Sequence, residues 1–221
     1  MKRIITVLAL LAQMTLLAQN NLTIKAGLEM DYKELDGLYV YTNDGSYYFT
    51  SGVAFSPIRS LQIGGRFGTD QLFEGGIGLG FGSIGFSTYE GEPLESSVFR
   101  KGIYMERYYS TSGRFVLGTG SQLYTYKMTL ERSFDEDYFI GEQTGSCTWK
   151  ANGLEWKLLA RLYFGENENH SLQGFFSLAG ELIKVSEFKV DNSKVEVLDE
   201  TIGVLAAHVG ISYAIVFNQR R

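Results

Sequence analysis

The sequence predicts an all-β protein, a transmembrane antiparallel up-and-down β-barrel of about ten strands, with eight strands as the alternative count. Three observations lead to this class. The 221 residues include only 2 prolines but 26 glycines, 14 tyrosines and 15 phenylalanines, which suits long strands with aromatic interface residues. Apolar residues recur at every second position, the period of a strand. After residue 18 no run reaches 18 consecutive apolar residues, which excludes a helical membrane protein.

The segment 202–217 carries the argument for a membrane. One of its faces is apolar and ends in aromatic residues, with Leu205, Ala207, Val209, Ile211, Tyr213, Ile215 and Phe217. The other face is small or polar, with Ala206, His208, Gly210, Ser212 and Ala214. A barrel that spans a bilayer needs an apolar face toward lipid and a polar face toward the lumen. The segment therefore predicts a barrel wall, and its place near the C-terminus lets it close the barrel against the first strand.

The N-terminus has the pattern of a secretory signal peptide. Lys2 and Arg3 precede an apolar run, 4–18, that ends in a small residue before a polar one. We predict cleavage after Ala18, so residues 1–18 are a signal peptide and residues 19–221 form one barrel domain. An uncleaved anchor helix is the alternative reading, although the run is short for one. No cysteine lies near the cut, which argues against a lipid-anchored lipoprotein.

Ten segments carry strand patterns in chain order. They are 22–32, 46–56, 61–68, 76–82, 83–89, 99–108, 114–127, 149–164, 171–185 and 202–217. Residues 38–41 are expected to extend the first strand above the membrane. Pro57 to Ser60 predicts a tight turn between the second and third strands. The fourth and fifth segments are the weakest, and reading them differently leaves eight strands.

Glycine alternates with Ile, Leu and Phe in the segment 76–82. A phosphate-binding loop would need a strand-to-helix context and a Lys-Ser or Lys-Thr pair, and neither is present. Glycines on the lumen face, which make room for large side chains opposite, are the preferred interpretation. In the next segment Ile84 and Phe86 are expected to face outward, as is Phe49 in the second segment.

The connections alternate between short turns and longer loops, with both termini on the short-turn side. The longer connections, expected on the opposite side, each carry net negative charge: 33–45, 69–74, 89–98, 128–148 and 186–201. A solvated face explains these charges without a ligand. The functional alternative is a surface for a cationic partner, or for divalent ions that bridge to lipopolysaccharide.

Charged residues also occupy inward positions and form the candidate site, a lumen charge network. The basic members are Lys25, Arg66, Arg100, Lys157 and Arg161, and the acidic members are Glu29, Glu106, Glu155 and Glu181. A barrel of eight to ten strands has a lumen little wider than its side chains. Charges buried there need partners, because an isolated buried charge is costly. The near balance of signs predicts a plugged lumen, with a narrow polar pore as the alternative.

The sequence offers little for catalysis or metal binding, so we predict a protein that is not an enzyme. His208 and Ser212 share a face, but four residues along a strand is roughly 13 Å, beyond hydrogen-bond reach. His170 lies in a short turn, and Cys147, the single cysteine, has no histidine nearby. No His or Cys pair has metal-ligand spacing, so neither metal nor cofactor is expected. The net charge of −5 argues against a nucleic-acid partner.

The chain resembles the small outer-membrane β-barrel proteins of Gram-negative bacteria. The resembling parts are the segment Met1–Ala18, the alternating strands and the closing segment Gly210–Phe217. In that group an aromatic-ending last strand is the signal for the barrel-assembly machinery. This chain departs from the pattern by adding residues 218–221 after Phe217.

The resemblance implies a location in the outer membrane of the cell envelope, with outer-membrane lipid and lipopolysaccharide as partners. It names no activity, because one fold can serve many functions. We expect a structural or surface-binding role through the acidic outer loops. The alternatives are a narrow passive channel for small solutes and a membrane-embedded hydrolase or acyltransferase.

Overall fold

A computed structural model describes residues 21–43, 45–67, 73–88, 94–109, 114–134, 143–165, 169–198 and 201–218. The predicted signal peptide, 1–18, lies outside these residues. The strands are β1 Asn21–Thr42, β2 Gly45–Phe67, β3 Phe73–Thr88, β4 Leu94–Tyr109, β5 Phe115–Phe134, β6 Gln143–Phe164, β7 His170–Val190, β8 Ser193–Lys194 and β9 Thr201–Asn218. No described segment is a helix with the length and apolarity needed to cross a membrane.

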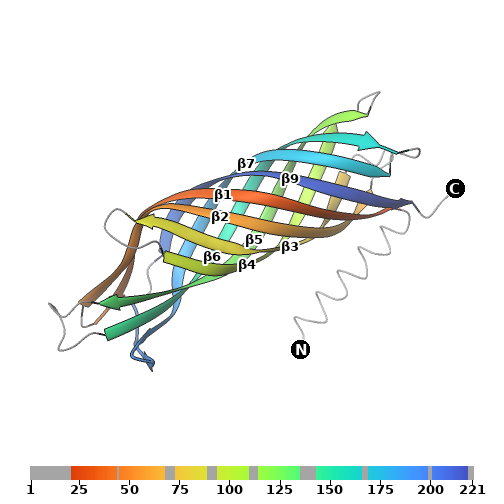
Figure 1. Cartoon of the computed structure of the whole chain (residues 1–221). Coiled ribbons are helices and arrows are strands. Elements are labelled where there is room, and N and C mark those ends of the chain that lie inside the picture. Colours follow the sequence, from red (N-terminus) through yellow and green to blue (C-terminus); the bar gives the residue numbers. More distant parts are fainter. Residues whose placement is uncertain are drawn as a thin grey trace, which may run out of the picture.

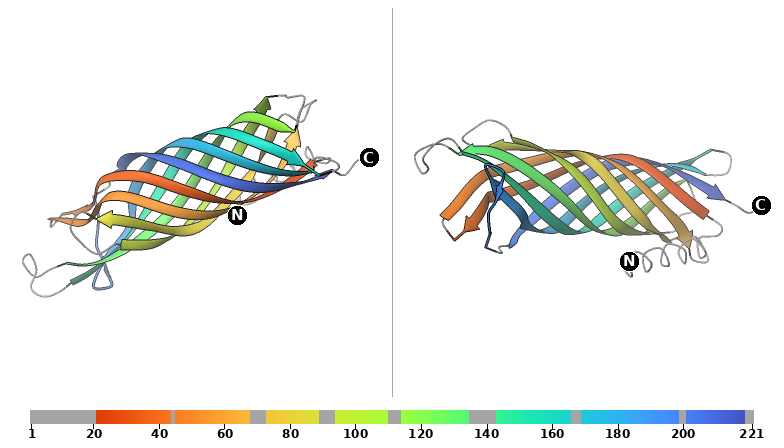
Figure 2. Two further views of the ribbon diagram at one scale, coloured as in Figure 1. Left: turned by 45° about the horizontal axis from the view of Figure 1, so that its top comes forward. Right: turned by 90° about the horizontal axis from the view of Figure 1, so that it is seen from below.

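Eight long strands close into a barrel (Figures 1 and 2). Each strand from β1 to β7 pairs antiparallel with the next, and β9 pairs with both β7 and β1. The two-residue β8 pairs only with the end of β7. The predicted up-and-down barrel is confirmed, and eight, the alternative count, is correct. We call the end where β1 begins and β9 finishes the terminal end, and the opposite end the distal end.

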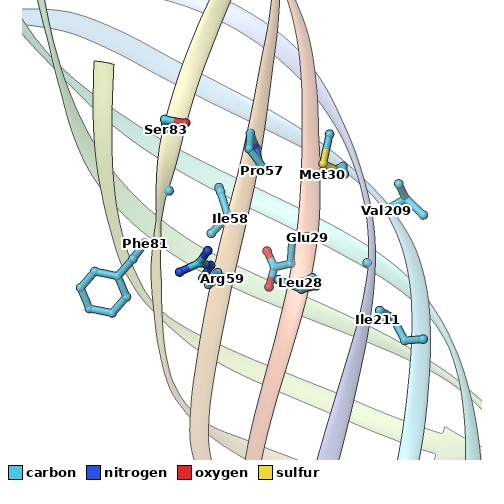
Figure 3. A pocket seen from close by; sticks show the side chains of 12 residues that line it. Leu28, Glu29, Met30, Pro57, Ile58, Arg59, Phe81, Ser83, Val209 and Ile211 are labelled. Carbon is cyan, nitrogen blue, oxygen red and sulfur yellow. The ribbon is translucent and has the colours of Figure 1, made fainter. Parts of the chain in front are cut away.

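The count of ten is wrong at Pro57, because β2 runs straight through the predicted turn. Proline has no N–H to give to a ladder. The β2–β3 pairing is therefore absent for two residues, but its register continues unchanged from Phe55–Gly85 to Ile58–Gly82. Outside this gap the wall is hollowed by about 820 Å³, between residues that include Met30 and Phe81 (Figure 3).

The weak segments 76–82 and 83–89 form one strand, β3. Because the strand does not break, its even-numbered residues stay inward throughout, and Ile84 and Phe86 are buried at 1% exposure. The expectation that these two side chains face outward is wrong. Phe49 is also inward and fully buried, because the β1–β2 register shifts near Leu35 and Leu38 and exchanges the faces.

The expected acidic loops are shorter than the sequence suggested. Residues 128–134 and 143–148 belong to β5 and β6, and most of 33–45 belongs to β1. The connection 68–72 lies between Phe67 and Phe73, which pair at the terminal end. The prediction that 69–74 is a loop among the longer, outer connections is therefore wrong, and Glu74 is an interior residue of β3.

The two faces of the wall differ as the alternation requires. Exposed apolar side chains cover the outside of the terminal half, among them Leu28, Ile63, Ile103, Leu117, Leu158, Leu178 and Val209. The inside has two zones along the barrel axis. Toward the terminal end it is filled by charged and polar side chains, and toward the distal end by a core of apolar ones.

Candidate functional site: the filled barrel interior

All nine residues of the expected charge network project into the interior. Eight of their side chains are buried, and the ninth, that of Arg66, is 9% exposed. The strand pleat accounts for this placement, since every second residue of each strand points inward. The structure brings the nine together with residues that the sequence did not single out.

Glu74 and Glu106 form the centre of a cluster nearest the terminal end. The Lys25 ammonium lies 2.6 Å from Glu74 Oε1 and 2.5 Å from Glu106 Oε2. Arg161 Nη1 donates to Glu74 Oε2 at 2.9 Å, and Arg161 Nη2 lies 3.4 Å from Glu106. Arg66 Nε reaches Glu74 at 3.4 Å. Three cations thus surround two carboxylates, and we call these five residues the Glu74–Glu106 cluster.

Uncharged side chains complete this cluster. The Tyr104 hydroxyl donates to Glu74 at 3.3 Å, and the Tyr108 hydroxyl donates to Glu106. The guanidinium of Arg161 lies over the Tyr108 ring, 4.2 Å from its centroid, and its Nε donates to Gln173 at 2.7 Å. These hydrogen bonds satisfy further polar atoms of the buried ion pairs. Arg66 Nη2 is buried without a hydrogen-bond partner among the described residues.

A middle layer lies between this cluster and the distal half. Arg100 donates to Glu29, and the Lys157 ammonium donates to Gln122 at 2.8 Å and lies 3.3 Å from Glu155. A cavity of about 10 Å³ remains here, lined by residues that include Lys25 and Glu106. Space of that size is about the minimum for a single water molecule.

A second group, the Lys33–His208 cluster, lies further toward the distal end and comprises Asp31, Lys33, Glu155, Glu181 and His208. Lys33 Nζ lies 2.7 Å from Glu181 Oε2 and 3.1 Å from Asp31 Oδ2. His208 has Nδ1 3.1 Å from Glu155 and Nε2 3.2 Å from Asp31, so each ring nitrogen faces a carboxylate. Only the contact between Nδ1 and Glu155 has hydrogen-bond geometry, and Nε2 has no hydrogen-bond partner among the described residues. The imidazole therefore lies between two carboxylates and is hydrogen-bonded to one of them.

Asp31, Glu181 and His208 bring three potential ligand atoms within 4.8 Å of one another. The Lys33 ammonium already bridges the two carboxylates, and Tyr124 and Tyr126 donate to Glu181 at 2.6 and 2.8 Å. A lysine in this position supplies the positive charge that a metal ion would bring. We interpret the group as an ion-pair cluster.

Apolar and aromatic side chains fill the distal half. Phe49 and Trp149 pack edge to face with ring centroids 4.9 Å apart, and Phe49 also contacts Phe188. Met128 and Leu130 are 1% exposed in the same core. Cys147 is buried here, and that burial raises the pKa of its thiol above the usual range.

The His208–Ser212 pair considered from the sequence does not form a nucleophilic site. His208 is 1% exposed and is held by Asp31 and Glu155. Ser177, rather than Ser212, reaches this group, and it donates to Glu155 at 2.5 Å. Among the described residues, the buried side chain of His208 has no surface that a substrate could contact.

Sequence reasoning missed Glu74, Asp31 and Lys33 as network members. Asp31 lies at an odd position of β1, as do the inward residues Lys25 and Glu29, so alternation already placed it inward. Lys33 would also have been placed inward if the first strand had been predicted to continue past residue 32. Glu74 was missed because the predicted segment 76–82 begins three residues after the observed start of β3 at Phe73. Alternation along the strands is consistent with the inward direction of the interior tyrosines, but nothing in the sequence indicates which carboxylate each tyrosine contacts.

No family model matches the chain, and no curated protein matches it. Among solved structures, it is similar to the outer membrane protein AlkL, with a TM-score of 0.51 and 10% identity, covering 91% of this chain and 92% of that one. Neisserial surface protein A gives 0.44 and 11%, covering 88% and 96%. The outer membrane protease OmpT from Escherichia coli gives 0.44 and 13%, covering 90% and 97%. The chain has the fold of the small outer-membrane β-barrels.

Proposed function

We propose that this protein is a non-conducting outer-membrane barrel with a structural or surface-binding role carried out at its distal end. The observation that carries the proposal is the filled interior. Charged clusters close the terminal half, an apolar core closes the distal half, and the cavity between Lys25 and Lys157 measures about 10 Å³. A conducting pore needs a continuous water-filled path. The described side chains occupy the interior along which such a path would run.

The outer wall supports the membrane location. Its belt of exposed apolar side chains is bordered by aromatic residues at the terminal end: Phe67, Tyr109, Phe115, Phe164 and Phe217. Toward the distal end the border includes Tyr32, Phe55, Phe81 and Phe99. Two aromatic girdles that flank an apolar band are typical of barrels in the bacterial outer membrane. Because β1 begins and β9 finishes at the terminal end, we place that end in the periplasm and the distal end outside the cell.

Cell fractionation combined with electrophoresis of heated and unheated samples tests the location. We expect the protein in the outer-membrane fraction, with a folded band that shifts on boiling. A protein that stays soluble without detergent would contradict the location. As part of the same proposal, the protein is exported through its signal peptide and inserted into the outer membrane by the barrel-assembly machinery.

Planar bilayer recordings test the closed interior. The wild-type barrel is expected to give no steady conductance. The double variant Phe49→Ala, Trp149→Ala removes the two rings that meet in the distal core. It tests whether removal of this packing opens the distal half of the interior. Steady conductance of the wild type, with an ion selectivity that responds to Arg161→Glu, would replace this proposal with the narrow-channel alternative.

The enzyme alternative has no support from the interior, because His208 is buried between two carboxylates. We therefore propose a non-enzymatic role. Covalent labelling of the folded barrel by a serine-directed probe would contradict this, and heat-denatured protein is the control for non-specific labelling.

A further inference from the structure

Three lysines form a row on the outside of the barrel. Lys127 of β5 is paired with Lys150 of β6, and Lys150 is paired with Lys184 of β7. The alternation turns all three side chains outward, and Lys127 and Lys184 are exposed. Directly opposite residues in a sheet have Cβ atoms about 5 Å apart, so the three positions span roughly 10 Å of the wall. We call Lys127, Lys150 and Lys184 the lysine row.

The lysine row has no acidic partner within 4 Å among the residues that the structure describes. Lys189, by contrast, lies 3.6 Å from Glu187. Outward neighbours of the row include the hydroxyl and amide residues Thr129, Thr148 and Asn152 as well as the apolar Phe99 and Leu182. Like charges placed directly opposite on neighbouring strands repel each other. A bound anion would relieve that repulsion.

The row lies where the outer wall changes from apolar to polar. On β7, exposed Leu178 and Leu182 lie on its terminal side, and Ser186 lies on its distal side. On β6, Trp156 and Leu158 lie on the terminal side. This is the level at which the headgroups of a surrounding leaflet would lie.

A groove in the apolar wall begins immediately on the terminal side of the row. One hollow of about 740 Å³ includes Leu123, Leu154 and Gly180, and a second of about 430 Å³ shares Leu154 and Gly180 and continues to Gly203. A Cβ added at Gly180 or Gly203 would meet nothing within 4 Å. These outward glycines leave the wall recessed. Lys101 lines the first hollow as a fourth cation.

We propose that the lysine row and this groove together bind a phosphorylated glycolipid of the outer leaflet, the lipid A part of lipopolysaccharide. The lysines hold its phosphates, and the groove receives an acyl chain. Lysine ammonium groups are common phosphate binders. The choice of this lipid rests on the proposed function, which places the distal end outside the cell and so the distal border of the apolar belt in the outer leaflet.

The test uses the whole barrel, purified in detergent from the outer membrane in the form that the cell produces. Native mass spectrometry measures the affinity for lipid A carrying two phosphates, for dephosphorylated lipid A and for phosphatidylglycerol. We expect the phosphorylated lipid A to bind best. Lys150→Gln with Lys184→Gln should weaken its binding about tenfold or more, because two charge-assisted contacts are lost. Lys189→Gln with Lys194→Gln removes the same charge at exposed sites near the loop tip and should leave binding within about twofold.

Two substitutions on β7, the strand that carries Lys184, test whether the groove contributes to binding. Gly180→Leu fills the recess and should weaken binding about fivefold. Gly174→Leu is the matched control, because Gly174 also has nothing within 4 Å of an added Cβ and lies closer to the terminal end. Its binding should stay within about twofold of the wild type.

Equal binding of dephosphorylated lipid A, equal binding of phosphatidylglycerol, or equal losses in the row variant and its charge-matched control would each overturn the inference. The heat-dependent gel shift of every variant is recorded in parallel. A barrel that shifts normally but does not prefer the phosphorylated lipid refutes this site alone. A chain that is soluble without detergent refutes the membrane location itself, so the two failures are distinguishable.

Discussion

Arg161 of β6 and Glu74 of β3 meet inside the barrel, with Nη1 2.9 Å from Oε2, although 87 residues separate them along the chain. Their strands are not neighbours, because β4 and β5 lie between them. The ion pair therefore joins parts of the wall that backbone hydrogen bonds do not connect directly. Both side chains are fully buried, so the charge of Glu74 is compensated by Arg161 and Lys25, and the charge of Arg161 is compensated by Glu74 and Glu106.

Arg161→Ala should destabilise the barrel by roughly 3–5 kcal/mol, because it leaves Glu74 and Glu106 with less positive charge in a buried place. The measurement is urea unfolding of the barrel refolded into lipid vesicles. Arg114→Ala is the control, since Arg114 is exposed at the terminal end. Equal, small effects of the two variants would mean that water enters the interior and screens the cluster.

Leu158→Arg should cost roughly 2–4 kcal/mol in the same assay, because Leu158 is 63% exposed in the middle of the apolar belt. Thr129→Arg adds the same side chain to an outward position beyond the belt and should cost about 0–1 kcal/mol. If both substitutions cost the same, the belt does not face lipid.

Gly153→Ala should destabilise the barrel by about 1–3 kcal/mol, since the added Cβ would lie 2.3 Å from the Tyr124 ring. The displaced ring would also weaken the hydrogen bond from Tyr124 to Glu181. Gly180→Ala is the control, because its added Cβ meets nothing within 4 Å. Similar unfolding midpoints for the two variants would contradict the tight packing of Tyr124 on β6.

Mass spectrometry of the exported protein should find an N-terminus at or within a few residues of Gln19, since residues 1–18 have the pattern of a signal peptide. Replacing Ala18 with a large residue such as Trp should slow or shift the cleavage, because small residues are preferred before the cut. An intact segment 1–18 in the membrane fraction would show that it is an uncleaved anchor.

Alternation was enough to predict which side of the wall most residues occupy, but breaks in the strands were predicted poorly. Pro57 suggested a turn, because proline commonly ends a strand, yet here its missing N–H falls at a two-residue gap in one ladder while the strand continues. Ile84 and Phe86 suggested an outward face because they are apolar. They are instead part of an apolar core inside the distal half, where the barrel packs as a soluble protein does.

The partners within the interior could not be predicted from the sequence. The charges of Lys157 and Arg161 have the same parity on β6, yet Arg161 meets Glu74 and Lys157 meets Glu155 and Gln122. That choice depends on strand tilt and on how far each side chain reaches across the interior. Parity fixes the face of a residue, but the barrel geometry fixes its partner.

The seam between β1 and β9 has a consequence for biogenesis. Asn21 pairs with Asn218, so the strand that leaves the ribosome first is completed by the strand that leaves it last. Until then both edges of the growing sheet offer unpaired N–H and C=O groups to any other strand nearby. Until the seam closes, these edges can pair with another copy of the chain. Keeping copies apart before closure is therefore a requirement that the ring-shaped sheet itself imposes on assembly.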